Sequence, residues 1–348
     1  MPGRRTCVES GPDLEAPIVT ELAQPPSTAA HGAPRSSRFA RFKLTRTERR
    51  GLRTGLLFIS PWLVGFLGFT LYPAIASLYY SFTNFKILQE PKSIGLGNYS
   101  ALVNDSLFWK SLGNTLYLTI VGVPLAVIVA LGIALLLNRK GVRGIGIFRT
   151  IFYLPVVIPG VAAGILFLFL LNPANGLLDQ TLGLLGIDGP GWFYDPAWAK
   201  NGIILLTVWA AGDVVIIYLG ALQGVSRALY EAAEVDGAGA WVKLRHVTIP
   251  MISPAILFNL ITGAIASFQR FTEAYVVGSG VGRGNDGSIG GVQNSLLLYG
   301  LNLYNNGFRY FQMGYASALA WILLLIILIA TILLLRASRN RVYYESAQ

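Results

Sequence analysis

The sequence has 348 residues, of which 53% are hydrophobic and 13% charged, and its mean hydropathy is +0.55. So few charges exclude an ordinary soluble domain, in which about 25% of residues are charged, and favour a chain embedded in lipid. The net charge of +10 is not accompanied by any nucleic-acid-binding pattern, and the single cysteine, Cys7, excludes a disulfide within the chain.

The beginning of the sequence differs in composition from the rest. Residues 1–50 are rich in proline and glycine, contain few large apolar residues and run into the basic stretch RSSRFARFKLTRTERRGLR. This composition predicts a disordered basic tail that lies in the cytoplasm and can rest on anionic lipid. The stretch lacks the apolar core of a signal peptide.

Six apolar runs follow, each long enough to cross a hydrocarbon core of about 30 Å as a helix. They predict an all-α membrane protein with a six-helix domain over residues 51–340 and a short cytoplasmic tail over residues 341–348. Pro155 and Pro159 interrupt the third run, where we expect one kinked span rather than two half-helices, because neighbouring helices can satisfy the freed carbonyls. The predicted spans are Leu56–Tyr80, Thr115–Leu137, Ile147–Leu171, Gly202–Leu222, Ala255–Val277 and Tyr315–Leu335.

The basic residues indicate the orientation of these spans. With the N-terminus inside, 20 of the 27 Lys and Arg residues fall in inner segments, six fall in outer loops, and Arg270 lies within a span. Basic residues collect on the cytoplasmic side of membrane proteins. We therefore expect both termini, and the segment 226–254 between the fourth and fifth spans, to be cytoplasmic.

Segment 226–254 carries its own helix signals between two long apolar runs. Ser226 is a candidate N-cap, the residues up to Glu234 favour a helix, and Gly237 can end it. Residues Ala240–His246 can form a second short helix before Pro250. An alternative is a pair of amphipathic helices that merely lies on the membrane surface.

The spacing in this segment resembles the EAA signature of permease subunits of ABC importers. Glu231-Ala232-Ala233 is followed after three residues by Gly237 and after nine more by Val247-Thr248-Ile249-Pro250. The resemblance implies the ABC importer permease fold, with segment 226–254 as a cytoplasmic loop that couples to an ATPase subunit. The implied coupling residues are Glu231, Ala232, Ala233, Asp236, Gly237, Ile249 and Pro250.

Further motifs resemble the MalF-like, carbohydrate-uptake branch of these permeases over most of residues 50–345. The branch implies a sugar or oligosaccharide substrate, a second permease subunit in a heterodimer, two ATPase subunits that bind ATP and Mg, an extracytoplasmic solute-binding protein, and a place in the prokaryotic cytoplasmic membrane. It implies no catalysis and no cofactor in this chain. The motifs are Leu71-Tyr72-Pro73, Tyr80-Ser81-Phe82-Thr83, Gly95–Tyr99, Asp105–Trp109, Leu154-Pro155, Ile158-Pro159, Asn172-Pro173, Gly176-Leu177-Leu178, Gly314–Trp321 and Val342–Glu345.

Two departures from this branch stand out. The segment Gly278–Gly291 is longer and more charged than the short turn usual there, and no outer loop carries a large insertion. Within the segment, residues 282–287 match a GxGxxG pattern, but no strand precedes it, so we expect a turn and not a dinucleotide site.

Ionisable residues in the spans indicate the substrate path, because a charge at mid-membrane is costly unless it faces a cavity or a partner. On the fifth span Asn259, Gly263, Ala266, Arg270 and Glu273 recur at helical spacing, and Gln269 lies beside them. On the fourth span we expect Trp209 and Asp213 to share a face, where an aromatic ring beside a carboxylate would suit a sugar. The alternative is that these charges form structural ion pairs between helices.

Small residues and metal ligands complete the predictions. The pairs Gly160–Gly164 and Gly314–Ala318 predict close helix packing. No His, Cys or carboxylate cluster has metal-ligand spacing, and the two histidines, His31 and His246, are far apart. Two other functions stay open on the sequence alone: an ion-coupled secondary carrier and an ABC permease for a solute that is not a sugar.

Overall fold

The computed structural model describes residues 46–339, except residues 88, 140, 142, 283, 285 and 286. Most of the predicted N-terminal tail and the whole of the tail 341–348 lie outside these residues. The chain divides into two compact units, residues 1–61 and residues 62–348. The described part of the first unit is the beginning of helix α1 (Arg46–Phe66).

Three continuous helical stretches of the described chain are long and apolar enough to span a membrane, namely Thr54–Ser81, Ser106–Leu137 and Met313–Ser338. The first runs from α1 through a π-turn into α2 (Tyr72–Ser81). The second joins α4 (Ser106–Tyr117) to α5 (Val123–Leu137) in the same way, and the third is α17 (Met313–Ser338). They correspond to the predicted first, second and sixth spans.

Helix breaks interrupt the other three predicted spans. The bend is 100° between α6 (Ile145–Val157) and α7 (Gly160–Leu170), and 46° between α9 (Ala199–Trp209) and α10 (Gly212–Gly224). A further bend, of 65°, lies just before the predicted fifth span, where the helical stretch Ala240–Met251 meets α14 (Ser253–Phe268). Counting each bent pair as one span, the described residues provide up to six.

The prediction of a single kinked third span is wrong. Ile158 is extended, with φ −74° and ψ 123°, and Pro159 follows with ψ 140°. The proline ring disfavours a helical conformation of the preceding residue, so two separate helices form here. Pro155, by contrast, lies inside α6.

The fifth span also ends earlier than predicted. Helix α14 stops at Phe268, and α15 (Thr272–Val281) begins only after Gln269, Arg270 and Phe271. The predicted continuous helical face from Asn259 to Glu273 is therefore wrong, although its residues return to one cavity, as described below.

Glycines allow close packing where α7 meets α15. A Cβ at Gly160 would lie 3.3 Å from Glu273 Oε1, and a Cβ at Gly164 would lie 3.1 Å from Val276 Cγ1. The predicted role of this pair in helix packing is confirmed. Gly314 has a different role, because its N–H donates to the carbonyl of Phe85 at 2.9 Å and its Cα faces a loop backbone.

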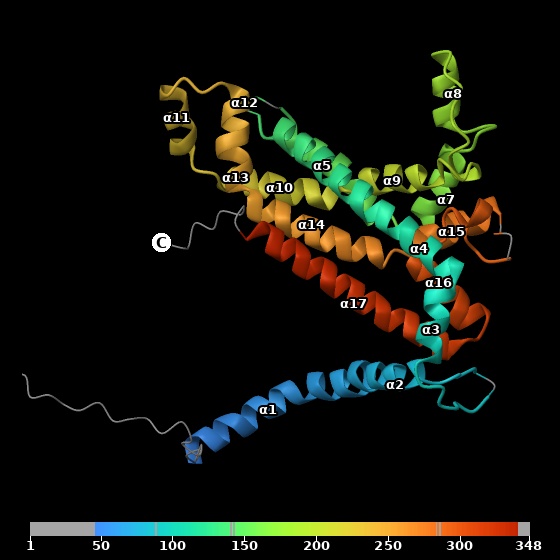
Figure 1. Ribbon diagram of the computed structural model, residues 1–348. Helices are drawn as coiled ribbons and strands as arrows, with labels where there is room; N and C mark the ends of the chain where they lie inside the picture. Colours follow the sequence, from blue (N-terminus) through green and yellow to red (C-terminus); the bar gives the residue numbers. More distant parts are fainter. Residues whose placement is uncertain are drawn as a thin grey trace, which may run out of the picture. The chain divides into compact units, whose positions relative to one another are not determined.

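Within residues 62–348, α5, α10 and α14 lie side by side and form the middle of the bundle (Figure 1). The hairpin that contains α11 (Arg227–Val235) and α12 (Ala240–Lys243) lies at one end of these helices, and α15 and α16 (Tyr299–Tyr304) lie at the other. The remaining α-helices of the described chain are α3 (Gly97–Asn104), α8 (Leu177–Leu184) and α13 (Ile249–Met251).

Candidate functional site

Two helix breaks, between α9 and α10 and between α14 and α15, contribute to one cavity of about 200 Å³. Ala210 and Ala211, from the α9–α10 break, line it, as does Arg270 from the α14–α15 break. The remaining wall comes from the π-turn that precedes α5, from α5 and α14, and from residues of α9, α10 and α15 next to the two breaks. At a helix break, backbone N–H and C=O groups are no longer hydrogen-bonded within the helix. Such non-helical backbone occurs at membrane depth where it is buried in protein or lines a water-filled cavity.

An ion pair lies in the wall of this cavity. Arg270 Nη1 is 3.5 Å from Glu273 Oε1, and their side chains are only 16% and 21% exposed. Glu273 also lies in the first turn of α15 and beside Gly160 at the start of α7. The positive end of a helix dipole favours a carboxylate at such a position. Arg270 and Glu273 therefore form an ion pair, but it joins residues three apart in the chain and not two helices as the alternative supposed, and both residues line the cavity.

Asp213 is the third charged residue that lines the cavity. It occupies the first turn of α10, where its Oδ1 accepts a hydrogen bond from the N–H of Val214 at 2.8 Å. No ion pair joins it to any residue that the structure describes. A carboxylate has about four lone-pair sites, so most of its accepting capacity remains open to the cavity.

Neutral polar side chains complete the lining. Asn259 is buried and donates from Nδ2 to the carbonyl of Ala255 at 2.9 Å, which leaves its Oδ1 as an acceptor. Ser267 lies 2.9 Å from the hydroxyl of Thr119, and Thr207 donates to the carbonyl of Ile203. The sequence analysis did not predict Ser267 or Thr207 as path residues. Ser267 could have been predicted, because it directly follows Ala266, which lies on the predicted polar face.

Two predicted path residues lie elsewhere. Trp209 packs against the ring of Phe167, with ring centroids 5.3 Å apart, and lines a separate void of about 20 Å³. Gln269 lies in a groove along α17. The prediction that Trp209 and Asp213 share a face is wrong, because the break at Ala210–Ala211 separates the two residues.

The second candidate element is the hairpin, defined here as residues Ser226–Met251. Its first arm is α11, and its second arm runs from α12 through a π-turn (Leu244–Thr248) into α13. The predicted first helix is confirmed, although Ser226 makes no capping hydrogen bond with its side chain. The second helix continues past His246 and includes Pro250, farther than predicted.

Gly237 makes the turn between the two arms. Its φ is +74°, its N–H donates to the carbonyl of Glu234 at 3.0 Å, and the N–H of Ala238 donates to that of Ala233 at 2.8 Å. These two bonds form the Schellman motif that ends a helix at glycine. The prediction that Gly237 ends the first helix is therefore confirmed.

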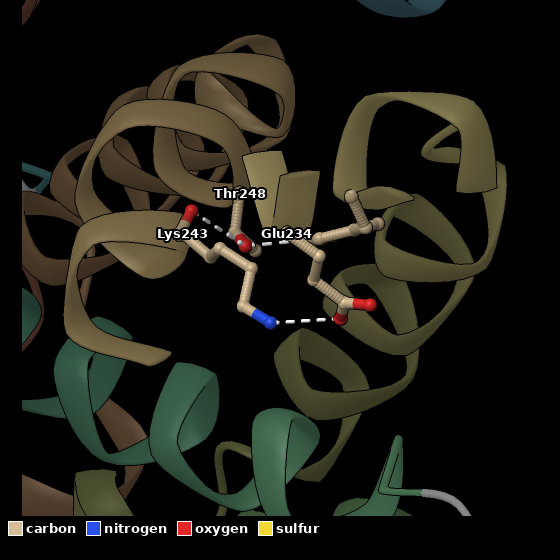
Figure 2. A network of polar contacts seen from close by, with 4 residues as sticks. Glu234, Lys243 and Thr248 are labelled. Atoms are coloured by element: carbon tan, nitrogen blue, oxygen red, sulfur yellow. Dashed lines mark hydrogen bonds and ion pairs between the residues drawn. The ribbon is translucent and has the colours of Figure 1, made fainter. Parts of the chain in front are cut away.

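Polar contacts hold the arms together (Figure 2). Between the arms, Lys243 Nζ lies 2.9 Å from Glu234 Oε1; within the second arm, the Thr248 hydroxyl donates to the carbonyl of Lys243 at 3.3 Å. The hydroxyls of Tyr230 and Thr248 are 3.0 Å apart.

Much of the hairpin surface is apolar and uncovered in the isolated chain. Val235 is 88% exposed and Trp241 71% exposed. Of the predicted coupling residues, Ala233 and Pro250 are half-buried, and the exposed ones are Glu231, Ala232, Asp236, Gly237 and Ile249.

Comparison with known proteins identifies the family. Residues 94–342, which include both the cavity and the hairpin, match the family model described as binding-protein-dependent transport system inner membrane component. The chain belongs to this family. It is thus an integral permease of the inner membrane and part of a transport system that also uses a binding protein.

Curated relatives align with the permease over most of its length. The probable ABC transporter permease YesP of Bacillus subtilis is 39% identical over 88% of this chain and 97% of the relative. The lactose transport system permease LacF of Rhizobium radiobacter is 37% identical over 86% and 100%. The arabinooligosaccharides transport system permease AraP of Bacillus subtilis is 34% identical over 81% and 87%.

A solved structure confirms the fold of the permease. A chain of a bacterial alginate ABC transporter, crystallised in complex with an alginate pentasaccharide-bound periplasmic protein, superposes with a TM-score of 0.72. The match covers 85% of this chain and 98% of the other at 23% sequence identity. The permease therefore has the helical ABC importer fold that the sequence predicted.

Proposed function

We propose that the permease forms, with a second permease subunit, the path for a sugar or oligosaccharide that an extracytoplasmic solute-binding protein delivers. The observation that carries this proposal is the 37% and 34% identity, over more than four fifths of the chain, to permeases named for lactose and for arabinooligosaccharides. In this proposal the two partner subunits that hydrolyse ATP drive the import, and the permease itself performs no catalysis.

The cavity supplies a polar surface for such a substrate. Asp213, Asn259 and the ion pair of Arg270 with Glu273 offer donors and acceptors to sugar hydroxyls inside an otherwise apolar bundle. A charge at mid-membrane costs about 2.5–3.5 kcal/mol, which a substrate path would explain. Trp209 and Gln269 stay predictions as path residues, and each lies outside this cavity.

The hairpin is the proposed contact with an ATPase subunit. An exposed apolar surface on a water-facing element indicates a protein interface, and Val235 and Trp241 provide one beside the exposed carboxylate of Glu231. In this assignment Glu231 makes an ionic contact with the ATPase, and Gly237 provides the turn that lets both arms enter a cleft.

The proposed orientation has both termini and the hairpin in the cytoplasm, and it can be tested by labelling. In a Cys7→Ser background, a cysteine at Asp188 should react with an impermeant maleimide in intact cells. A cysteine at Ser226 should react only after permeabilisation. The opposite pattern would place the hairpin outside, where no ATPase can reach it.

Transport in sealed vesicles tests the function itself. We expect uptake of a neutral oligosaccharide to require ATP, the binding protein and both permease subunits, and to persist when ion gradients are collapsed. Uptake that follows a cation gradient without ATP would establish an ion-coupled carrier instead. ATP-driven uptake of an amino acid or ion, with none of any sugar, would establish an ABC permease for another solute.

A further inference from the structure

We infer that the cavity selects sugars by charge: it accepts neutral sugars and rejects anionic ones such as uronic acid oligosaccharides. This inference rests on the proposed function, because it names the class of sugar that the same cavity takes. It follows from how the three charged residues in the cavity wall, Asp213, Arg270 and Glu273, are paired.

The cation in this wall is already neutralised. Arg270 is the basic residue among the described residues that line the cavity, and its guanidinium faces Glu273 Oε1 at 3.5 Å. Both side chains are largely buried, so the pair is weakly screened by solvent. An anionic substrate would have to separate this pair to gain a counter-charge, and it would then leave the Glu273 carboxylate unpaired.

Asp213 adds an uncompensated negative charge. With one arginine and two carboxylates, the described wall has a formal charge of −1. The carboxylate of Asp213 takes one backbone N–H and can accept sugar hydroxyls with its remaining lone pairs. Asp213 is exposed in the isolated chain, and a second carboxylate brought close to it on a substrate would be repelled by its like charge.

The lining also determines how a neutral sugar would be held. The described lining residues are small or aliphatic apart from the polar and charged groups, and they include no aromatic ring. Trp209, the ring predicted for this role, packs against Phe167 instead. Recognition in this cavity therefore depends on hydrogen bonds to hydroxyl groups, so that replacing a hydroxymethyl group by a carboxylate changes the binding energy directly.

Binding to the purified complete transporter, without its binding protein, tests the inference. β-1,4-Mannobiose and β-1,4-dimannuronate form a matched pair in which each hydroxymethyl group becomes a carboxylate. We expect calorimetry to show mannobiose binding at least about tenfold more tightly. High salt should reduce only the part of this preference that comes from the exposed Asp213, because the Arg270–Glu273 pair is largely buried.

Variants assign the preference to named residues. Asp213→Asn should lessen the preference for mannobiose, and Glu273→Gln, which releases the guanidinium of Arg270, should lessen it further. The double variant should prefer dimannuronate. Asp213→Glu keeps the charge and should keep the preference, as should Glu90→Gln, a control that removes an exposed carboxylate from an outer loop.

Equal or tighter binding of dimannuronate by the unmodified transporter would overturn the inference. So would an unchanged preference in both Asp213→Asn and Glu273→Gln, or no binding of either sugar at millimolar concentrations. Uptake through the complete system is measured separately. A transporter that imports neutral sugars in vesicles but fails these binding tests would contradict the charge selection alone and leave the proposed function standing.

Discussion

The connecting segments on the two sides of the fifth span are built in opposite ways. The hairpin, residues 226–251, precedes this span and leaves large apolar side chains such as Val235 and Trp241 uncovered. The segment 282–312 follows the span, and its described part completely buries a run of apolar residues in its middle, while Phe308, Tyr310 and Phe311 at its end are exposed. Those with 0% exposure are Leu296, Leu297, Leu298, Tyr299 and Leu301.

Buried amide and hydroxyl groups hold the second segment in place. Asn114 of α4 donates from Nδ2 to the carbonyls of Asn294 and Leu297, at 3.0 Å each. The Thr115 hydroxyl accepts from the N–H of Tyr299 at 2.9 Å. Burial raises the pKa of the Tyr299 hydroxyl, so it stays protonated and donates to the carbonyl of Leu319 at 2.8 Å.

The difference indicates which segment needs a partner. A buried apolar run whose backbone is hydrogen-bonded to neighbouring helices of its own chain contributes stability, whereas exposed apolar surface on a connecting hairpin indicates an interface. We therefore expect changes in the hairpin to alter coupling at constant yield, and changes in segment 282–312 to alter yield at constant coupling.

The largest effect on coupling should come from Gly237→Asp. A residue with a Cβ loses about 1–2 kcal/mol in the left-handed conformation, and the new charge would lie at the proposed interface. Because nothing lies within 4 Å of a Cβ there, the chain should still insert in the membrane. We expect ATP-driven uptake to fall about tenfold or more at normal expression.

Gly239→Asp is the matched control, because Gly239 has equally open surroundings but φ −68°. It should retain most uptake. Equal losses in both variants would assign the effect to charge and not to backbone conformation, and normal uptake by Gly237→Asp would contradict the coupling role of the turn.

Asn114→Ala should give the largest loss of stability. It removes the donor from two buried carbonyls, at a cost of about 1–3 kcal/mol for each unsatisfied group. We expect a lower thermal midpoint of the purified complex and a lower yield, with normal uptake per molecule. Asn104→Ala, at an exposed amide that bonds within its own helix, should change neither. A normal thermal midpoint of Asn114→Ala would show that this hydrogen-bond network does not stabilise the permease.

Glu231→Gln should have an intermediate effect. The carboxylate is exposed and its proposed partner is a basic residue of the ATPase, so we expect several-fold less ATPase to co-purify with the permease at low salt, and little difference at high salt. The thermal midpoint of the permease alone should not change. Full recovery of the ATPase at low salt would exclude Glu231 as the ionic contact.

Lys243→Met should have the smallest effect. The carboxylate of Glu234 is 63% exposed, and such ion pairs contribute about 0–1 kcal/mol. The contacts of Thr248 with Tyr230 and the turn at Gly237 remain. We expect uptake and ATPase recovery close to normal, as measured beside Gly237→Asp. A loss as large as in Gly237→Asp would mean that the hairpin depends on this pair.

Local signals in the sequence were sufficient to locate the spans and the hairpin. The length of each apolar run limits where a helix can cross the bilayer, and a glycine after a run of helix formers predicts a helix end. The first arm, Arg227–Val235, and the turn at Gly237 follow directly from such signals. The charges that line the cavity were also recognisable, because an ionisable side chain inside an apolar run is rare.

The breaks between α9 and α10 and between α14 and α15 were decided by tertiary packing. Ala210 and Ala211 favour a helix, and Gln269, Arg270 and Phe271 include neither proline nor glycine, yet both places interrupt a span. The Trp209 ring consequently packs against the ring of Phe167 and does not line the cavity that Asp213 lines. The contact of Asn114 with Asn294, 180 residues later, was equally invisible in the sequence. Each depends on which helices meet, and apolar runs of similar composition do not specify their neighbours, because association inside lipid is governed by detailed packing and not by hydrophobicity.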